Sequence, residues 1–313
     1  MARAIAYTAF GGPEVLQLVN VPDPNPGDGE LAVRVEAAGV NPIDWKLRSG
    51  LRPSAAITEP RRVGSDAAGV ITAVGAGVDG FGVGDPVVCK GVSGAYATDV
   101  VVSAADAWIR PSQVSPVEGA ALGVPVGTAY QTARSLDVRA GDTLLVHGGS
   151  GAVGQAIIQY AVLWGATVLA TASAVRFDRV RALGAIPIAY GPGLADRVRA
   201  VAPGGISVAI DAAGTDEALQ TSVELVADKA RIATLVRGRD APGYGIRAFS
   251  GGSPAPLTQQ QNAWRTEAIP VTLALMSTGS FSVEGGPTFP LAEAAEAHRV
   301  GQAGARGKIV LLP

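Results

Sequence analysis

An apolar strand pattern that runs directly into a glycine-rich turn constrains this chain more than any other feature. Residues 142–154 are Asp-Thr-Leu-Leu-Val-His-Gly-Gly-Ser-Gly-Ala-Val-Gly, and a helical pattern follows from Ala152. Gly149, Gly151 and Gly154 have the spacing of a dinucleotide-binding turn, G-x-G-x-x-G. In such a turn the first glycine permits the tight bend, the second lets the pyrophosphate approach, and the third lets helix and strand pack closely. A P-loop is the competing interpretation, but the Gly-Lys-Ser/Thr ending that it requires is missing.

The turn and the helix start behind it are therefore the expected pyrophosphate site. A helix start offers unpaired N–H groups and the positive end of the helix dipole to phosphates. The residues assigned to this role are Gly149, Ser150, Gly151, Ala152, Val153 and Gly154. His147, just before the turn, is interpreted as structural, with proton donation as the alternative, and His298 is expected to be a packing or surface residue.

The end of the second strand predicts which dinucleotide is bound. An NAD site usually carries Asp or Glu there to bind the ribose hydroxyls, but this strand ends Thr171-Ala172-Ser173 and is followed by Arg176 and Arg179. Hydroxyl donors and a guanidinium favour a 2′-phosphate, which a carboxylate would repel. We therefore predict NADPH, bound here by Thr171, Ser173 and Arg176. The alternative is that both arginines belong to the solvated face of a helix over 175–183.

Composition limits the class of protein. With 313 residues, 48% of them hydrophobic and 17% charged, the chain suits one large or two ordinary domains. A net charge of −2 gives no basic surface for nucleic acid, and the single cysteine, Cys89, excludes an internal disulfide and a multi-cysteine zinc site. The apolar run 155–175 contains a helix, a Gly-Ala break and a strand, so we expect no membrane partner. A strand pattern begins at the N-terminus without a signal peptide, which favours the cytoplasm.

The pattern of elements changes near residue 115. Strands and Pro/Gly-rich turns fill the first hundred residues, with strands expected at 4–7, 16–19, 31–38, 69–74 and 86–89. Ser115-Pro116-Val117-Glu118 has the form of a capping box, and predicts one helix to about Leu136. Strands and helices then alternate, which predicts a doubly wound parallel sheet. Strands are expected near 142–147, 166–171, 186–190, 207–210, 230–236 and 307–312, an irregular stretch over 237–256, and helices over 258–277 and 291–300.

Several segments carry a family likeness that covers essentially the whole chain. They are Ala38–Lys46, Gly64–Val70, Gly94–Ala97, the turn at 147–154 and the tail Gly307–Leu311. In these the chain resembles the quinone oxidoreductase (zeta-crystallin-like) branch of the medium-chain dehydrogenase/reductase superfamily. The resemblance implies an α/β protein with a GroES-like β-barrel domain over 1–118 and 257–313 and a doubly wound Rossmann domain over 119–256.

The same resemblance allows the zinc ligands of the superfamily to be compared with the residues of this chain. Zinc-dependent members of the superfamily carry a cysteine at the position of Val40 and Gly-His-Glu at the position of Gly64-Ser65-Asp66. A tetrahedral zinc site needs three or four Cys, His or carboxylate ligands. With one cysteine and two histidines the chain lacks the superfamily's set, so we expect metal-free chemistry.

The resemblance also implies roles for residues outside the turn. It assigns Asn41 and Thr128 to the nicotinamide and substrate region, as catalytic and cofactor-binding residues. Alternatively, Asn41 is a turn residue before Pro42, and Thr128 is a helix hydroxyl bonded to its own backbone. It further implies Tyr190 near the adenosine 2′-phosphate, with Gly214 and Leu235 along the cofactor track.

The substrate residues are less regular. Trp45 and Lys46 stand where quinone reductases often carry a smaller residue and a tyrosine. We predict that Asn41, Trp45, Lys46 and Arg52 contact the substrate, with Lys46 as a catalytic acid or oxyanion partner. The alternatives are a solvated Lys46 and a surface Arg52.

These expectations combine into one activity. Without a metal to polarise a carbonyl, a quinone or an α,β-unsaturated carbonyl is a better hydride acceptor than a simple ketone. We therefore predict an NADPH-dependent reductase of quinones or enones. The resemblance further implies a homodimer that forms through the edge of the Rossmann sheet. The alternatives are a pathway-specific enoyl reductase of secondary metabolism, a low-turnover NADPH-binding protein and an enzyme that oxidises alcohols with NADP⁺ without a metal.

Overall fold

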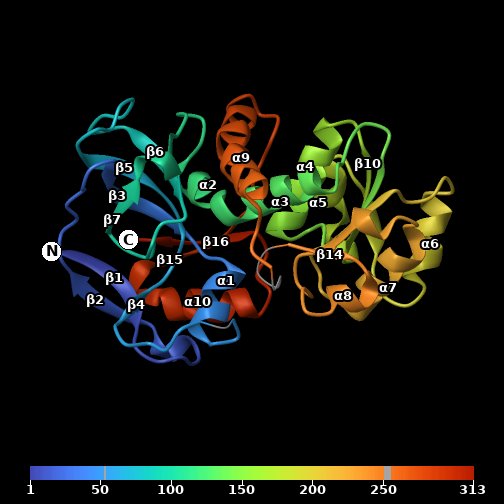
Figure 1. Ribbon diagram of the computed structural model, residues 1–313, viewed down its shortest axis with the longest axis horizontal. Helices are drawn as coiled ribbons and strands as arrows, with labels where there is room; N and C mark the ends of the chain where they lie inside the picture. The colour runs from blue at the N-terminus through green and yellow to red at the C-terminus, as the bar shows by residue number, and fades with distance from the viewer. Residues whose placement is uncertain (53, 250–254) are drawn as a thin grey trace. The chain divides into compact units, whose positions relative to one another are not determined.

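A computed structural model of the protein describes residues 1–52, 54–249 and 255–313. Contacts between residues divide the chain into two compact units, which are coloured along the chain in Figure 1. Unit 1 comprises Met1–Val124 and Ile269–Pro313, and unit 2 comprises Pro125–Ala268. The domain ranges 1–118 with 257–313 and 119–256 stay a prediction.

Unit 1 is built mainly from antiparallel strands. One sheet has the order β15-β16-β3-β5-β6-β8, with β7 also paired to β3, and a second has the order β2-β1-β4. The strands of this unit are β1 (Ala2–Tyr7), β2 (Gln17–Val21), β3 (Glu30–Gly39), β4 (Arg61–Arg62), β5 (Asp66–Val74), β6 (Pro86–Lys90), β7 (Asp99–Ser103), β8 (Ala107–Ile109), β15 (Gly285–Pro290) and β16 (Lys308–Leu312). Its helices are α1 (Pro42–Arg48), α2 (Pro116–Ala120) and α10 (Ala294–Gln302).

Unit 2 contains one parallel sheet of order β11-β10-β9-β12-β13-β14. Its strands are β9 (Thr143–His147), β10 (Thr167–Ala172), β11 (Ile186–Ala189), β12 (Val208–Asp211), β13 (Ile232–Thr234) and β14 (Arg247–Ala248). The connecting helices are α4 (Ala152–Leu163), α5 (Phe177–Ala182), α6 (Leu194–Val201), α7 (Asp216–Leu225) and α8 (Ala241–Tyr244). Two further helices, α3 (Gly123–Ser135) and α9 (Gln259–Ser277), cross the unit boundary. The predicted α/β class with a parallel sheet is confirmed.

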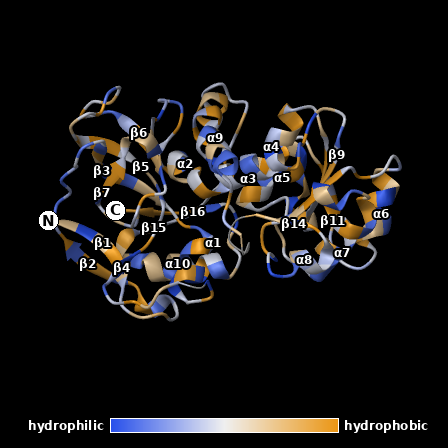
Figure 2. Ribbon diagram, viewed as in Figure 1, coloured by the Kyte–Doolittle hydropathy of each residue, from blue (hydrophilic) through white to orange (hydrophobic). Residues whose placement is uncertain are grey.

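The parallel sheet is apolar on both faces, which explains the continuous hydrophobic runs in the sequence. Leu144, Leu145 and Val146 of β9 are successive residues that point to alternate faces, and all three are fully buried. The strands around β9 and β11 are accordingly mostly orange in the hydropathy colouring of Figure 2. Burial on both sides leaves the ends of the strands as the places where polar side chains gather.

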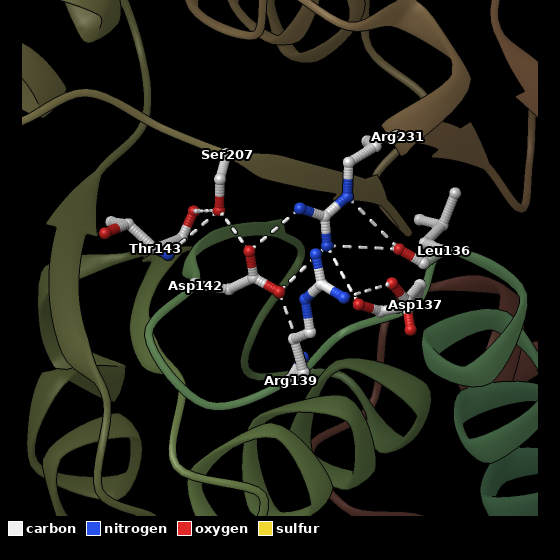
Figure 3. A network of polar contacts seen from close by, with 7 residues as sticks. All are labelled: Leu136, Asp137, Arg139, Asp142, Thr143, Ser207 and Arg231. Atoms are coloured by element: carbon white, nitrogen blue, oxygen red, sulfur yellow. Dashed lines mark hydrogen bonds and ion pairs between the residues drawn. The ribbon is translucent and has the colours of Figure 1, made fainter.

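A polar network joins the amino ends of three adjacent strands of this sheet (Figure 3). Asp142, which precedes β9, accepts hydrogen bonds from Ser207 Oγ at 2.8 Å and from Arg231 Nη1 and Nη2 at 2.9 and 2.8 Å. Ser207 precedes β12 and Arg231 precedes β13. Burial raises the pKa of Asp142, but the hydrogen bonds from Arg231 and Ser207 outweigh burial and leave that pKa below its usual value. The carboxylate therefore fixes where three strands begin.

The predicted single helix over 116–136 is wrong, because the structure contains two. The expected capping box does start α2, since Ser115 Oγ accepts from the Glu118 amide at 3.3 Å and Glu118 Oε2 accepts from the Ser115 amide at 2.9 Å. A second start follows because Asp66, distant in sequence, accepts from the Val124 amide at 2.9 Å. A Cβ on Gly123 would lie 2.1 Å from Asp66 Oδ1, so only glycine fits there.

The stretch 237–256, predicted to be irregular, contains structure in its described part. Helix α8 lies within it, and β14 extends the sheet by pairing with β13. Residues 250–254 lie outside the described residues. The sequence pattern missed these elements because each has only two to four residues, too few to show a period.

A chain of buried polar side chains crosses the core of unit 1. Arg48 Nη1 lies 3.3 Å from His298 Nδ1, His298 Nε2 lies 3.2 Å from the Tyr96 hydroxyl, and that hydroxyl donates to Asp44 Oδ2 at 2.8 Å. Since arginine only donates, His298 Nδ1 must accept and Nε2 carries the proton. Burial, together with the nearby Arg48 charge, lowers the pKa of His298 to about 3. His298 is thus a packing residue, one of the two predicted alternatives.

Asp44, at the end of this chain, makes stability depend on pH. Burial raises its pKa from 3.8 to about 7, so the folded state favours the protonated carboxyl. That contribution is complete below pH 3.8 and is lost as the pH rises through 7. Between pH 4.5 and 7.5 we expect the unfolding free energy of the wild type to fall by about 3 kcal/mol relative to Asp44→Asn, whose amide stays neutral. Urea unfolding at both pH values measures this difference.

The matched control is Asp79→Asn, because Asp79 is exposed. Its unfolding free energy should stay within about 0.5 kcal/mol of the wild type at both pH values. A gap between wild type and Asp44→Asn that does not change with pH would contradict the assignment.

Candidate functional site

The glycine-rich turn joins the carboxyl end of β9 to the start of α4. Gly148 has a φ of +73°, the left-handed conformation that favours glycine. Gly149 does not, but a Cβ on it would lie 2.6 Å from Ala170 Cβ on β10. The G-x-G-x-x-G spacing predicts the tight bend at Gly149. The structure corrects this: Gly148 makes the bend, and Gly149 is needed for packing against the neighbouring strand.

Gly154 brings the first turn of α4 against this bend. A Cβ on Gly154 would lie 2.2 Å from the Gly148 carbonyl oxygen and 2.8 Å from Gly149 Cα, both of them backbone atoms. No side chain fits at this distance, so the helix can begin this close to the turn only with glycine.

The start of α4 fits a phosphate group. Its N-cap, Gly151, has extended backbone and no side-chain cap, whereas α7 is capped by Thr215 Oγ1, which accepts from the Ala218 amide at 3.2 Å. The amides of the first helical turn lack an intrahelical acceptor, so an anion can take that place. A Cβ on Gly151 would meet only the Gly148 carbonyl oxygen, at 3.5 Å, so the backbone is open to close approach there.

Side chains behind the turn hold its conformation. Thr171 Oγ1 and the Thr171 carbonyl accept from the Gly148 and Gly149 amides at 3.2 and 2.9 Å. Gln155 Nε2 donates to the Ser150 carbonyl at 2.8 Å, and Gln155 Oε1 accepts from Arg179 Nε at 2.8 Å. Arg179 thus contacts a residue of α4. Its two predicted roles were a contact with the phosphate and a place on a solvated helix face, and neither included this contact.

Apart from Thr128, the residues of unit 2 that were predicted to bind the cofactor lie at or just after the carboxyl ends of strands. Carboxyl ends of parallel strands meet at one edge of a sheet, and the order of this sheet reverses between β9 and β12, where α/β proteins bind ligands. Ser173 and Arg176 are half-buried and Tyr190 is 60% exposed. The residues are Gly149–Gly154 after β9, Thr171, Ser173 and Arg176 at β10, Tyr190 after β11, Gly214 after β12 and Leu235 after β13.

Thr128 lies on α3 and is 4% exposed. Its hydroxyl accepts a hydrogen bond from Arg265 Nη2 on α9 at 3.3 Å. This partner was not predicted, because Arg265 is distant from Thr128 in the chain.

Asn41 belongs to unit 1, where it is 1% exposed and begins α1. Its Nδ2 donates to Asp66 Oδ2 at 2.8 Å and to the Gly39 carbonyl at a long 3.4 Å, and its Oδ1 accepts from Lys308 Nζ. Because an ammonium only donates, Lys308 fixes which end of the amide faces it. Burial lowers the pKa of Lys308.

Asp66 and Lys308 both contact Asn41, although neither was predicted as a site residue. The available signal was a charged residue at the start of each of two apolar strands, β5 and β16, inside segments that carry the family likeness.

The remaining predicted substrate residues differ in their surroundings. The Trp45 ring lies edge-on to His298 with centroids 5.9 Å apart, and a Cβ on Gly301 would lie 2.9 Å from it, so Trp45 packs against α10. Lys46 is half-buried, and no described residue gives its ammonium a hydrogen bond or ion pair. Arg52 is exposed.

His147 is buried at the end of β9, and its Nε2 lies 3.1 Å from Ser222 Oγ. The Ser222 hydroxyl donates to the Ala218 carbonyl at 2.8 Å, so the imidazole N–H donates to Ser222. Burial lowers the pKa of His147 to about 4, although the Asp211 charge opposes this shift. These contacts give His147 a packing role.

Among residues 1–52, 54–249 and 255–313, no group of three or more His, Cys, Asp or Glu side chains is arranged to hold a metal ion. In the described part of the chain, no helix combines the length and hydrophobicity needed to cross a membrane.

Comparison with known proteins identifies the family. The model of the alcohol dehydrogenase GroES-like domain matches residues 27–112, and that of the zinc-binding dehydrogenase family matches residues 152–241. A quinone oxidoreductase of Pseudomonas aeruginosa is 32% identical over 335 residues, covering 100% of both chains. A quinone oxidoreductase of Pongo abelii is 40% identical over 175 residues, and there the match spans about half of each protein, 55% of this chain and 53% of the relative.

A solved structure agrees with these sequence matches. The Escherichia coli quinone oxidoreductase complexed with NADPH has a TM-score of 0.85 and 26% identity, with 100% of both chains covered. The match confirms the GroES-like and Rossmann-like parts predicted from the sequence. The chain belongs to the zinc-independent quinone oxidoreductase branch of the medium-chain dehydrogenase/reductase superfamily.

Proposed function

We propose that this protein is an NADPH-dependent reductase that transfers hydride to a quinone or an α,β-unsaturated carbonyl without a metal. The observation that carries the proposal is the uncapped start of α4 behind Gly148 and Gly154, which suits a dinucleotide pyrophosphate. Relatives named quinone oxidoreductase support the acceptor class.

The preference for NADPH rests on the end of β10. The segment Thr171-Ala172-Ser173 carries no carboxylate, while Ser173 and Arg176 are half-buried beside it. A guanidinium and a hydroxyl stabilise a 2′-phosphate by charge-assisted hydrogen bonds. The NADPH complex of the Escherichia coli relative supports the same choice.

The residues of the chain would bind and orient the reactants, while the bound reduced nicotinamide supplies the hydride. Hydride addition leaves an enolate or phenolate, which hydrogen-bond donors stabilise. We propose three donors for this role. They are the side-chain N–H of Asn41 whose contact with the Gly39 carbonyl is long, the hydroxyl of Thr128 and the ammonium of Lys46.

Other predicted features belong to the same proposal. Trp45 and Arg52 would contact the acceptor, and Tyr190, Gly214 and Leu235 would contact the cofactor. We also propose a cytoplasmic homodimer that associates through the edge of the parallel sheet, without nucleic-acid or membrane partners.

Steady-state oxidation of NADPH with quinones, enones and enoyl thioesters, after dialysis against a chelator, tests the activity. We expect turnover of quinones or enones, with kcat/KM at least about tenfold higher for NADPH than for NADH, because one charged hydrogen bond contributes roughly 1.5–3 kcal/mol. Turnover of enoyl thioesters alone would favour the pathway-specific enoyl reductase. Tight NADPH binding with no acceptor turned over would contradict the proposal, as would activity only with alcohols and NADP⁺.

Gly151→Ala tests the pyrophosphate site separately. The added methyl group meets only the Gly148 carbonyl oxygen at an ordinary 3.5 Å, so the fold should tolerate it. Because it occupies the backbone surface proposed for the pyrophosphate, we expect the Kd for NADPH to rise about tenfold, with Tm within about 3 °C. Fluorescence titration and thermal unfolding measure the two effects.

The control is Gly204→Ala, since a Cβ on Gly204 would have no heavy atom within 4 Å. It should leave both Kd and Tm at wild-type values. Wild-type affinity in Gly151→Ala would place the pyrophosphate elsewhere.

A further inference from the structure

Two loops of the parallel sheet lie on one side of its switch point. The residues proposed for the adenosine half of the cofactor lie on the other side. The glycine-rich turn follows β9, and the residues proposed for the adenosine end follow β10 and β11. A dinucleotide bound with its pyrophosphate at this turn extends its other half toward the opposite side of the switch point. On that side are the loops after β12 and β13, which carry Gly214 and Leu235.

Asp211 organises the first of these loops. It ends β12 and is fully buried. Its Oδ1 accepts from the Ala213 and Gly214 amides at 2.9 and 2.8 Å, and its Oδ2 accepts from Thr234 Oγ1 at 2.7 Å. One carboxylate therefore uses both oxygens to hold a loop and to reach the next strand.

Thr234 organises the second loop in the same way. It ends β13, is fully buried, and its Oγ1 accepts from the Val236 and Arg237 amides at 3.2 and 3.0 Å. The Leu235 amide donates to the Asp211 carbonyl at 2.8 Å. The two loops are thus joined through the Asp211–Thr234 hydrogen bond and through the backbone.

Packing contacts and the Arg237 side chain also connect the two loops to each other. Gly214 has a φ of +74°, and a Cβ on it would lie 2.4 Å from Val236 Cγ1. Arg237 Nη1 donates to the Gly214 carbonyl at 3.3 Å and to Asp216 Oδ1 at 2.9 Å. A change at Asp211 or Thr234 would therefore shift both loops together.

We propose that Asp211 and Thr234 are positioning residues that shape the binding surface for the nicotinamide half of the cofactor. The inference rests on the proposed function, since it needs a dinucleotide at the glycine-rich turn. Neither side chain touches the cofactor itself: both are fully buried and act through the loops that carry Gly214 and Leu235. Their effect is confined to one half of the dinucleotide, because the adenosine side is built on β10 and β11.

Calorimetric titration with NADPH and with 2′,5′-ADP, a fragment that lacks the nicotinamide half, tests this inference. We expect Thr234→Val, which removes only the hydroxyl, to raise the Kd for NADPH about tenfold and to leave that for 2′,5′-ADP within about twofold. Thr234→Ser, which keeps the hydroxyl, should bind both ligands within about threefold of the wild type. Thr132→Val is the control, because the buried Thr132 hydroxyl has no hydrogen-bond partner among the described residues; it should change neither Kd.

Arg237→Gln keeps the inference testable if Thr234→Val does not fold, because Arg237 is partly exposed, with 33% of its side chain accessible. It should weaken NADPH binding about threefold without affecting 2′,5′-ADP. Equal losses for both ligands, or wild-type affinity for both in every variant, would overturn the positioning role. A wild-type protein that binds neither ligand would instead overturn the proposed function.

Discussion

The close approach of α4 to the turn after β9 is the contact on which the rest of the proposed site depends. A side chain at Gly154 would overlap the Gly148 carbonyl oxygen, so only glycine lets the helix begin directly against the strand end. That closeness directs the uncapped amides of the first helical turn to the carboxyl edge of the sheet. A longer connection would separate the helix dipole from the loops after the neighbouring strands.

Polar side chains stabilise different parts of the fold at the two edges of the parallel sheet. At the amino edge, Asp142, Ser207 and Arg231 fix the starts of β9, β12 and β13 through a nearly buried ion pair. At the carboxyl edge, Asp211 and Thr234 hold loops rather than strands. The polar side chains at both edges are buried or partly buried and make hydrogen bonds, which is the condition under which they stabilise the fold. The sheet between the two edges is apolar, so the polar groups that could bind a cofactor lie at the strand ends and in the loops.

Local patterns allowed much of the fold to be predicted, and long-range contacts account for what was missed. Apolar runs predicted β1–β3, β5, β6, β9–β13 and β16, and the glycine spacing predicted the turn, because both are properties of neighbouring residues. Strands β4, β7, β8, β14 and β15 were not predicted. The break before Gly123 depends on Asp66, and the orientation of Asn41 depends on Lys308, each remote in sequence. The role of Gly148 was missed because φ is a property of the folded turn, and G-x-G-x-x-G spacing does not report it.

We propose that the glycine-rich turn binds a reduced, 2′-phosphorylated nicotinamide nucleotide with no cation assisting. Calorimetric titration of chelator-treated protein with NADPH and then with NADH is its most direct test. We expect one NADPH to bind per chain, at least about tenfold more tightly than NADH. Equal affinity for the two nucleotides, or binding that appears only when a divalent metal is restored, would contradict it.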